Sequence, residues 1–420
     1  MTHKMAALSV DPDVDVSEMD RTDPLRHLRA SFDLPADTIY LCGNSLGPLP
    51  GNVGARLADV VQRQWGESLI RSWNAHSWFA MPERLGARLA TLIGAQAHEV
   101  TVADSTSVNL FKAACCARGL RPQRRRIVTE TGNFPTDAYV LQGLAQLLGP
   151  GTEYLAVERD RVLDAVDEDT AVLVLTHVHY KDCAMFDMAE VTRRAQARGA
   201  LVVWDLSHSV GAVCVDLNAC NADFAVGCTY KYLNGGPGAP AFIFAAERHH
   251  AAMNPGLVGW WGHEQPFDFA EGYSPAAGMR RTLSGTGPIL GFATLDAALD
   301  IFDGVDMAAV RAKSLRLSSL FLDLVAEKCA GFGLRAITAR DNPQRGSHVA
   351  LAHADGFAIM QALIRRNVIG DFRAPDVMRF GLTPLYLRYR DVWDAVEALS
   401  QVLRHGEWKS AELGRRARVT

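Results

Sequence analysis

Residues 200–231, ALVVWDLSHSVGAVCVDLNACNADFAVGCTYK, carry the two features that decide the fold. One apolar run ends in Asp205, and a second, at 224–229, is followed closely by Lys231. Uninterrupted apolar runs of this kind are typical of strands in a parallel sheet, because both faces of such a sheet are buried. Side chains that follow these strands lie at the carboxyl edge of the sheet, where open α/β sheets bind ligands. The segment therefore predicts an acid and a lysine at a ligand-binding edge.

The middle of the chain repeats the alternation of strand and helix that this segment contains. Further strands are predicted at 126–129, 171–176 and 239–245, and helices at 135–147, 187–198 and 208–213. Strands that alternate with helices in this way form a mostly parallel sheet with helices on both faces. We therefore expect an α/β fold for the larger part of the chain.

Both ends of the chain follow other patterns. A polar arm precedes a short strand at 38–41, and residues 53–93 have helical apolar spacing with a break near Asn74. From about residue 290 onward the predicted helices are 289–302, 307–329, 356–366 and 391–404. The predicted strands are short and lie at 334–337, 348–352 and 377–380. A chain of 420 residues also exceeds the size of one hydrophobic core. We predict an arm at 1–50 that packs with the small domain, a large domain at 51–289 and a small α+β domain at 290–420.

The composition is that of an ordinary globular protein, with 48% hydrophobic and 21% charged residues. The net charge of −4 does not favour binding to nucleic acid. No run approaches the roughly 18 apolar residues of a membrane span, and the first residues lack the apolar core of a signal peptide. The eight cysteines form no Cys-x-x-Cys pair, which is typical of reduced thiols. We expect a cytoplasmic protein without nucleic-acid or membrane partners.

A carboxylate and a lysine at neighbouring strand ends fit the chemistry of pyridoxal 5'-phosphate (PLP). The lysine can form a Schiff base with the cofactor, and the carboxylate can keep the pyridine nitrogen protonated so that the ring accepts electrons. A plain salt bridge between Asp205 and Lys231 explains the same two residues. The surrounding segments must therefore decide between the two interpretations.

Two of those segments suit the phosphate and the ring of PLP. Residues 104–109, DSTSVN, place hydroxyls and backbone amides directly before a predicted helix, although an ordinary Ser/Thr helix cap has the same sequence. Residues 133–137, NFPTD, contain Phe134, which could lie flat on a pyridine ring, and Asp137, which could point to its edge. A plain helix start with Pro and Asp in its first turn explains that stretch equally well.

In this order, these segments resemble kynureninases, which are fold-type-I PLP enzymes of the aminotransferase class V group. The resemblance extends over nearly the whole chain, and the stretches YKYLNGGPG at 230–238 and GNSLG at 43–47 are the most specific to the family. The other matching stretches are 40–42, 107–110, 133–137, 204–211, 259–263, 345–349, 379–380 and 384–386.

The resemblance implies a role for each matching residue. Lys231 would form the Schiff base, Asp205 would hold the pyridine nitrogen with His208 beside it, and Phe134 would stack on the ring with Asp137 nearby. The residues implied at the phosphate end are Thr106, Ser107 and Tyr230, together with Trp260 and Thr286, which the partner subunit of a homodimer would supply. Thr176 would lie near the phenolic oxygen of the ring. The residues implied for substrate binding are Arg379, which suits a carboxylate, Asn44 and Ser45.

The reaction that the resemblance implies is hydrolytic Cβ–Cγ cleavage of L-kynurenine to anthranilate and L-alanine, a step of tryptophan catabolism. Its catalytic residues would be Lys231, Asp205 and Tyr230. Because Tyr230 neighbours both the lysine and a phosphate, our hypothesis is that it is the acid that protonates the alanine fragment left after the bond breaks. Gly66 occupies the place where animal members of the family have a histidine. Plain kynurenine is therefore the expected substrate, with 3-hydroxykynurenine as a second one.

Two sequence motifs suggest other kinds of site. Gly43-Asn44-Ser45-Leu46-Gly47 matches the nucleophile elbow of α/β-hydrolases, but Pro48 and Pro50 interrupt the helix that must follow the serine. The histidine pairs His177-x-His179 and His249-His250 have no acidic or thiolate residues at metal-ligand spacing. We therefore expect neither a serine nucleophile nor a metal.

Three other functions share the PLP fold. A cysteine desulfurase needs a reactive cysteine on a mobile loop, and after residue 228 the sequence offers only Cys329, at the end of an apolar helix. A transaminase is chemically feasible, although the GNSLG and WWGH stretches favour a kynureninase. A non-catalytic ligand sensor would have no need of Lys231, Asp205 and Arg379 together.

Overall fold

The computed structural model describes residues 15–339, 344–410 and 412–413, so the first part of the predicted arm lies outside the described residues. The chain divides into two compact units. The large unit consists of Asn52–Tyr180 and Phe186–Asp303. The small unit contains the described residues up to Gly51, the segment Lys181–Met185 and the described residues from Gly304 onward. The carboxy-terminal part of the small unit thus begins at Gly304, later than residue 290, and the unit includes a short segment from the middle of the chain.

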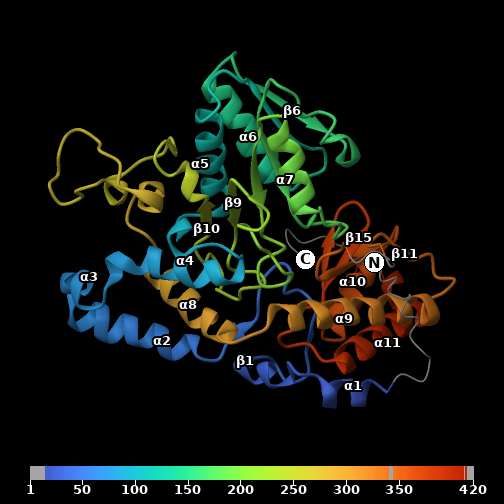
Figure 1. Ribbon diagram of the computed structural model, residues 1–420. Coiled ribbons are helices and arrows are strands. Elements are labelled where there is room, and N and C mark those ends of the chain that lie inside the picture. Colours follow the sequence, from blue (N-terminus) through green and yellow to red (C-terminus); the bar gives the residue numbers. More distant parts are fainter. Residues whose placement is uncertain (1–14, 340–343, 411, 414–420) are drawn as a thin grey trace. The chain divides into compact units, whose positions relative to one another are not determined.

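The large unit is built on a seven-stranded sheet with the strand order β4-β10-β9-β8-β7-β5-β6 (Figure 1). The strands are β4 (Val100–Val102), β5 (Arg126–Glu130), β6 (Glu153–Val157), β7 (Thr170–Thr176), β8 (Leu201–Asp205), β9 (Phe224–Gly227) and β10 (Phe242–Ala245). Strands β9, β8, β7, β5 and β6 are parallel, whereas β10 is antiparallel to both β9 and β4. The predicted, mostly parallel sheet is confirmed. Strands β4 and β6 were not predicted, because β4 is very short and β6 is only partly buried.

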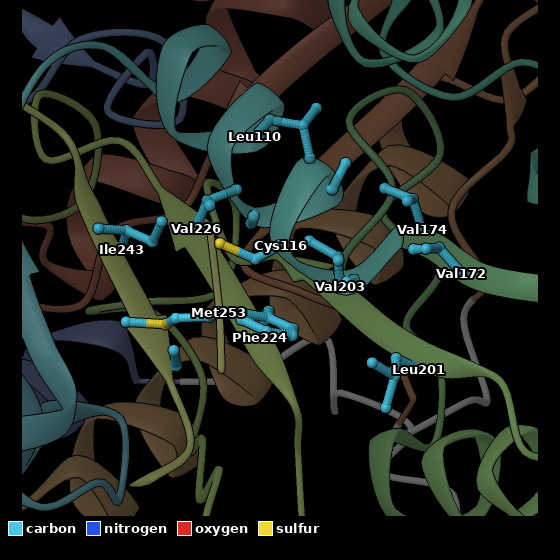
Figure 2. Packing of buried hydrophobic residues seen from close by; sticks show 14 of the residues in the cluster. Leu110, Cys116, Val172, Val174, Leu201, Val203, Phe224, Val226, Ile243 and Met253 are labelled. Carbon is cyan, nitrogen blue, oxygen red and sulfur yellow. The ribbon is translucent and has the colours of Figure 1, made fainter. Parts of the chain in front are cut away.

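Helices cover both faces of this sheet. The helices of the large unit are α2 (Val53–Asp59), α3 (Ser72–Ala75), α4 (Met81–Leu92), α5 (Thr106–Gly119), α6 (Pro135–Leu148), α7 (Met188–Ala197) and α8 (Ile289–Leu299). Leu110 and Cys116 of α5 belong to one buried cluster with Val203 of β8 and Val226 of β9 (Figure 2). The next residue of β8, Trp204, points to the opposite face, where its Nε1 donates to Thr192 Oγ1 of α7 at 3.1 Å.

The helix predicted at 208–213 is wrong. These residues form a series of turns, in which the amides of Ser209 and Val210 both donate to the carbonyl of Leu206. The chain cannot continue as a helix because Gly211 has a φ of +77°. The turns keep residues 206–213 close to the end of β8.

The small unit combines a four-stranded antiparallel sheet with long helices. Its helices are α1 (Val16–Thr22), α9 (Met307–Lys328), α10 (Gly356–Arg365) and α11 (Tyr389–His405). The sheet order is β11 (Arg335–Ala336), β12 (His348–Ala352), β15 (Val377–Gly381) and β14 (Asp371–Arg373). Two short ladders join β1 (Phe32–Asp33) to β3 (Leu49–Pro50) and β2 (Ile39–Tyr40) to β13 (Val368–Ile369). The amino-terminal residues thus pair directly with the carboxy-terminal part.

Candidate active site

Thr176 and Asp205 lie side by side at the carboxyl edge of the large sheet. They are register partners at the ends of the parallel strands β7 and β8. Both side chains are buried, and Asp205 Oδ1 accepts a hydrogen bond of 2.7 Å from the amide of Ser207. This amide fixes the carboxylate at the edge where the sequence predicted it, because the turn after β8 brings the donor back to the strand end.

A second carboxyl group, Asp137, lies beside Asp205. It belongs to the first turn of α6, where Asn133 Nδ2 donates to its Oδ2 at 3.3 Å and Thr176 Oγ1 donates to the same oxygen at 3.4 Å. Burial raises the pKa of Asp137 well above its usual range, and the charge of Asp205 raises it further. Two buried carboxyl groups in contact cannot both ionise at low cost, so a cation next to them would be strongly favoured.

Replacing Asp137 by asparagine is expected to stabilise the cofactor-free protein at neutral pH. A carboxyl group whose folded pKa is raised contributes its full stability only below its unfolded pKa of about 3.9. That contribution is lost as the pH rises through the raised folded value, because the unfolded chain ionises first. Asparagine never ionises, so the variant should gain unfolding free energy over the native chain from about pH 4 upward.

Urea unfolding of both proteins across this pH range measures the difference. If the difference in unfolding free energy between the two proteins does not change with pH, the ionisation of Asp137 does not destabilise the folded chain.

Lys231 lies on the turn after β9, against aromatic groups. Its Nζ is 3.0 Å from His208 Nε2, and it is 5.9 Å from the ring centroids of both Phe134 and Tyr230. His208 comes from the turns that follow β8, and Phe134 is the residue that caps α6. The structure thus brings four of the predicted residues together from three separate segments.

The hydroxyl of Tyr230 is held in its protonated form. Burial raises the pKa of Tyr230, and the nearby Cys228 and Asp205 raise it further. The group therefore remains a phenol throughout the neutral range. In this form it can act as an acid that donates a proton, and it cannot act as a base.

The predicted phosphate residues lie at the start of α5. Ser105 caps the helix, and its side chain accepts from the amide of Val108 at 3.4 Å. Thr106 is the first residue of the helix, and its Oγ1 is shielded from solvent without a hydrogen-bond partner among the described residues. Ser107 follows in the same turn. A helix start that combines such a hydroxyl with unpaired amides suits an anion.

Trp260 and Thr286 are not part of the Lys231 cluster in the described contacts. The ring of Trp260 stacks on Trp261 with centroids 5.7 Å apart, and it also meets Trp73, Phe79 and Phe267. Thr286 is exposed to solvent. Among the described residues, neither of the two contacts Lys231, His208, Phe134 or Tyr230, so within one chain they stay apart from the Lys231 cluster.

In the small unit, Arg379 is a buried cation with a well-defined partner. It lies on β15, opposite Asp371 of β14, and its Nε donates to Asp371 Oδ1 at 2.7 Å. Its Nη2 donates to Ser45 Oγ at 2.9 Å, and Ser45 Oγ donates in turn to Asp371. Arg373 contacts the same carboxylate at 3.0 Å. The cluster holds two guanidinium groups and one carboxylate, which leaves a net positive charge.

The protonation state of Asp371 follows from these contacts. Burial alone would raise its pKa, but hydrogen bonds and charges from Arg379, the charge of Arg373 and a hydrogen bond from Ser45 lower it below its usual value. Asp371 is therefore ionised at neutral pH. An ionised partner on one edge of a guanidinium fixes the plane of that group, and a second carboxylate must then approach from another edge.

The loop that carries Ser45 has a structural requirement of its own. Asn44 is fully buried, and both ends of its amide lack a hydrogen-bond partner among the described residues. A Cβ on Gly381 would come within 2.4 Å of Asn44 Oδ1, so the close approach requires glycine there. Turns and a bend follow at residues 43–46, and no helix begins after Ser45. The nucleophile-elbow interpretation is therefore wrong.

The other alternative motifs also have structural explanations. Cys329 is buried at the end of α9, and burial raises the pKa of its thiol to about 11, which keeps it unreactive at neutral pH. His249 Nε2 lies 2.9 Å from Asp223 Oδ1, and His250 Nε2 lies 2.8 Å from the carbonyl of Ala245. Within the described ranges no group of three or more His, Cys, Asp and Glu side chains forms a metal site.

The residues at the sheet edge fit PLP in their donor chemistry. The Asp137–Asp205 pair favours a cation, and a protonated pyridine nitrogen is one. Phe134 has 42% of its surface exposed, so a ring face is available for stacking. The hydroxyl of Thr106 has no partner in the described chain and suits a phosphate oxygen. Lys231 supplies the amine. These four features come from one sheet edge and the segments that follow its strands.

Three residues that this geometry makes important have no role predicted from the sequence. Asn133 donates to Asp137 and accepts a hydrogen bond from Thr176 at 2.5 Å. Asp371 and Arg373 lie on a strand that the sequence analysis did not predict. For Asp371 the sequence did contain a signal. An acid and an arginine on the two strands of a hairpin can lie opposite each other, as Asp371 and Arg379 do.

Comparison with known proteins shows which family the chain is similar to. A family profile described as "Kynureninase C-terminal domain" matches residues 310–399. The kynureninase of Burkholderia mallei (strain SAVP1) is 50% identical over 407 residues, which cover 96% of this chain and 98% of that protein. The kynureninase of Pseudomonas fluorescens is 48% identical over 411 residues, which cover 97% of this chain and 99% of that protein.

Solved structures with the same fold have more distant sequences. The cysteine desulfurase CsdA of Escherichia coli has a TM-score of 0.75 at 19% identity and covers 91% of this chain and 98% of its own. The cysteine desulfurase of Thermococcus onnurineus NA1 has a TM-score of 0.76 at 17% identity, with coverages of 90% and 98%. These likenesses confirm the predicted fold type I. Because the full-length similarity at about half identity is to kynureninases, this chain belongs to the kynureninase family.

Proposed function

We propose that this protein is a PLP-dependent hydrolase that cleaves the Cβ–Cγ bond of L-kynurenine and releases anthranilate and L-alanine. The observation that carries the proposal is the position of the Lys231 amine, 3.0 Å from His208, on a sheet edge that also holds the Asp137–Asp205 pair. Family membership supplies the substrate class. Plain kynurenine is the proposed substrate, with 3-hydroxykynurenine as a second one.

The roles of the residues follow from their chemistry. Bound PLP supplies an electron sink for the carbon atom next to the substrate's amine. Asp205 would keep the pyridine nitrogen protonated, with His208 beside it, and Phe134 would stack on the ring. Thr176 would lie near the phenolic oxygen of the ring, and Asp137, whose pKa is raised by burial and by the charge of Asp205, would lie beside Asp205.

The Lys231 amine would hold the cofactor covalently, and a free amine at this position could move protons. In the small unit, Arg379 binds the substrate carboxylate, and Asn44 and Ser45 contact the substrate. These roles assign cofactor binding to the large unit.

Tyr230 is the proposed acid, and Tyr230→Phe tests it. The phenol stays protonated because its pKa is raised by burial, so it can donate to the alanine fragment after the bond breaks. Loss of a positioned general acid typically costs about 10²–10⁴-fold in rate. We expect kcat to fall by about 10²-fold while the visible absorbance of bound cofactor is retained.

The matched control is Tyr139→Phe, because Tyr139 is an exposed tyrosine of α6 in the same unit. A Tyr230→Phe variant with the cofactor bound and full turnover would rule out the proton-donor role.

The proposal also includes a homodimer in which Trp260 and Thr286 complete the phosphate site of the partner subunit. In its support, several large apolar side chains around these residues are exposed, among them Leu257, Val258, Phe267, Phe269 and Leu290. All eight cysteines are free thiols, in keeping with the cytoplasmic location that we propose. Among the described residues, no helix is long and apolar enough to cross a membrane.

The direct test is a spectrum of the purified protein, followed by addition of L-kynurenine while anthranilate fluorescence is recorded. Visible absorbance and anthranilate release would support the cofactor and the reaction together. A yellow protein that leaves kynurenine intact would keep the cofactor and overturn the substrate. Sulfide release from cysteine would then point to a desulfurase, and silence with every amino acid would point to a sensor. A colourless protein that PLP cannot reconstitute would overturn the whole proposal.

A further inference from the structure

Lys112 is a completely buried lysine of α5, the helix whose amino terminus is the proposed phosphate site. It belongs to the second turn of α5, and its side chain runs back toward the helix amino terminus, as helical side chains do. Its Nζ donates to Asp104 Oδ2 at 2.6 Å and to the carbonyl of Thr282 at 2.6 Å. Its side chain has no exposed surface, whereas that of Asp104 is 30% exposed.

Asp104 controls the turn that leads from β4 into α5. Its φ of +50° is in the left-handed region, which non-glycine residues adopt at a cost. The carbonyl of Asp104 accepts from the amide of Ala241 at 2.9 Å, and its carboxylate accepts from Lys112, so both of its polar groups are tied down. The turn places Ser105, Thr106 and Ser107 at the helix start.

The ammonium group of Lys112 lies near the amino terminus of α5, where a positive charge is unfavourable. The helix dipole puts about half a positive charge at the amino terminus, so an ammonium group there is unfavourable unless an anion offsets it. The Asp104 carboxylate offsets the Lys112 ammonium only. The helix dipole, the free amides and the unpartnered hydroxyl of Thr106 remain for a further anion.

We propose that Lys112 and Asp104 are positioning residues that set the affinity of the α5 amino terminus for the cofactor's phosphate; this inference rests on the proposed function. Asp104 holds the left-handed turn, and Lys112 cancels the carboxylate charge that would otherwise repel a phosphate dianion. The ion pair also ties the turn, through the carbonyl of Thr282, to the segment that leads to Thr286. Neither residue touches the reacting atoms in this assignment.

The test compares the binding of PLP with the binding of pyridoxal, which lacks the phosphate, to cofactor-free full-length protein in phosphate-free buffer. Lys112→Met leaves the Asp104 carboxylate uncompensated, so the dissociation constant of PLP should rise about tenfold or more. Pyridoxal affinity should stay the same. Asp104→Asn keeps a side chain that tolerates the left-handed turn and removes the repelling charge, so PLP should bind as tightly as before or more tightly.

The double variant Lys112→Met with Asp104→Asn separates charge from structure. If Lys112→Met acts by exposing the carboxylate, removing that carboxylate should restore most of the lost PLP affinity. Equal weakening of PLP and pyridoxal in Lys112→Met, or a double variant no better than the single one, would show a purely structural role and overturn the inference.

If Lys112→Met does not fold, Asp104→Asn alone tests the inference. A loss of affinity for PLP but not for pyridoxal in Asp104→Asn would overturn it. Lys409→Met is the surface control. A native protein that binds neither ligand would contradict the proposed function itself. A native protein that prefers PLP, with a folded Lys112→Met variant that keeps this preference unchanged, would contradict only the role of the ion pair.

Discussion

Lys231→Ala is expected to abolish kynurenine turnover, with a fall of roughly 10⁴-fold or more in kcat. In its proposed role the amine links to the cofactor and then carries protons, so its loss should remove two functions at once. In the structure it stands 3.0 Å from His208 and within 5.9 Å of the Phe134 and Tyr230 ring centroids, and no other lysine amine is recorded in this cluster of described residues. Anthranilate fluorescence measures the turnover, and the visible spectrum measures the altered cofactor.

A control and a rescue experiment make this result specific. Lys409→Ala replaces an exposed lysine of the small unit and should leave both readouts unchanged. A small primary amine added to Lys231→Ala should restore part of the turnover, because it can carry the proton in place of the missing side chain. Full activity in Lys231→Ala would contradict the assignment of the Schiff-base lysine and the proposed function with it.

Arg379→Lys is expected to raise KM for L-kynurenine by about 10²-fold while kcat changes much less. Lysine keeps the charge but cannot hold Asp371 and a substrate carboxylate in one planar arrangement. Weakening a buried, hydrogen-bonded charge pair typically costs about 2–5 kcal/mol, and about 2.7 kcal/mol corresponds to 10²-fold in affinity. In the proposed role Arg379 binds a carboxylate that takes no part in the reaction, so the loss should appear in KM.

Steady-state kinetics, together with competitive inhibitors that carry a carboxylate or a carboxamide, test this prediction. Arg379→Lys should weaken the carboxylate inhibitor and leave the carboxamide almost unaffected. Arg365→Lys is the matched control, since Arg365 pairs with Glu412 at the surface of the same unit. Equal weakening of both inhibitors would mean that Arg379 supports the fold of the small unit and does not read the carboxylate.

Much of the fold follows from local sequence patterns. The buried strands β7, β8 and β9 and the helices α6, α7, α9 and α11 were predictable, because apolar runs and helical spacing are local signals that burial reinforces. Strand β14 was not, since its three residues form a strand only by pairing with β15. The helix predicted at 208–213 failed because the left-handed Gly211 ends any regular structure there.

The candidate site divides in the same way. The sequence by itself determined which chemical groups are present: the Asp205 and Lys231 pair after two apolar runs, the hydroxyls before α5 and the family motifs around them. Only the tertiary structure decided which groups meet. It paired Thr176 with Asp205 in register, brought Asp137 against Asp205, and joined Arg379 to Asp371 and Ser45. Contacts of this kind depend on strand register and on turns between distant segments, and these are set by the packing of the whole sheet, which no local pattern encodes.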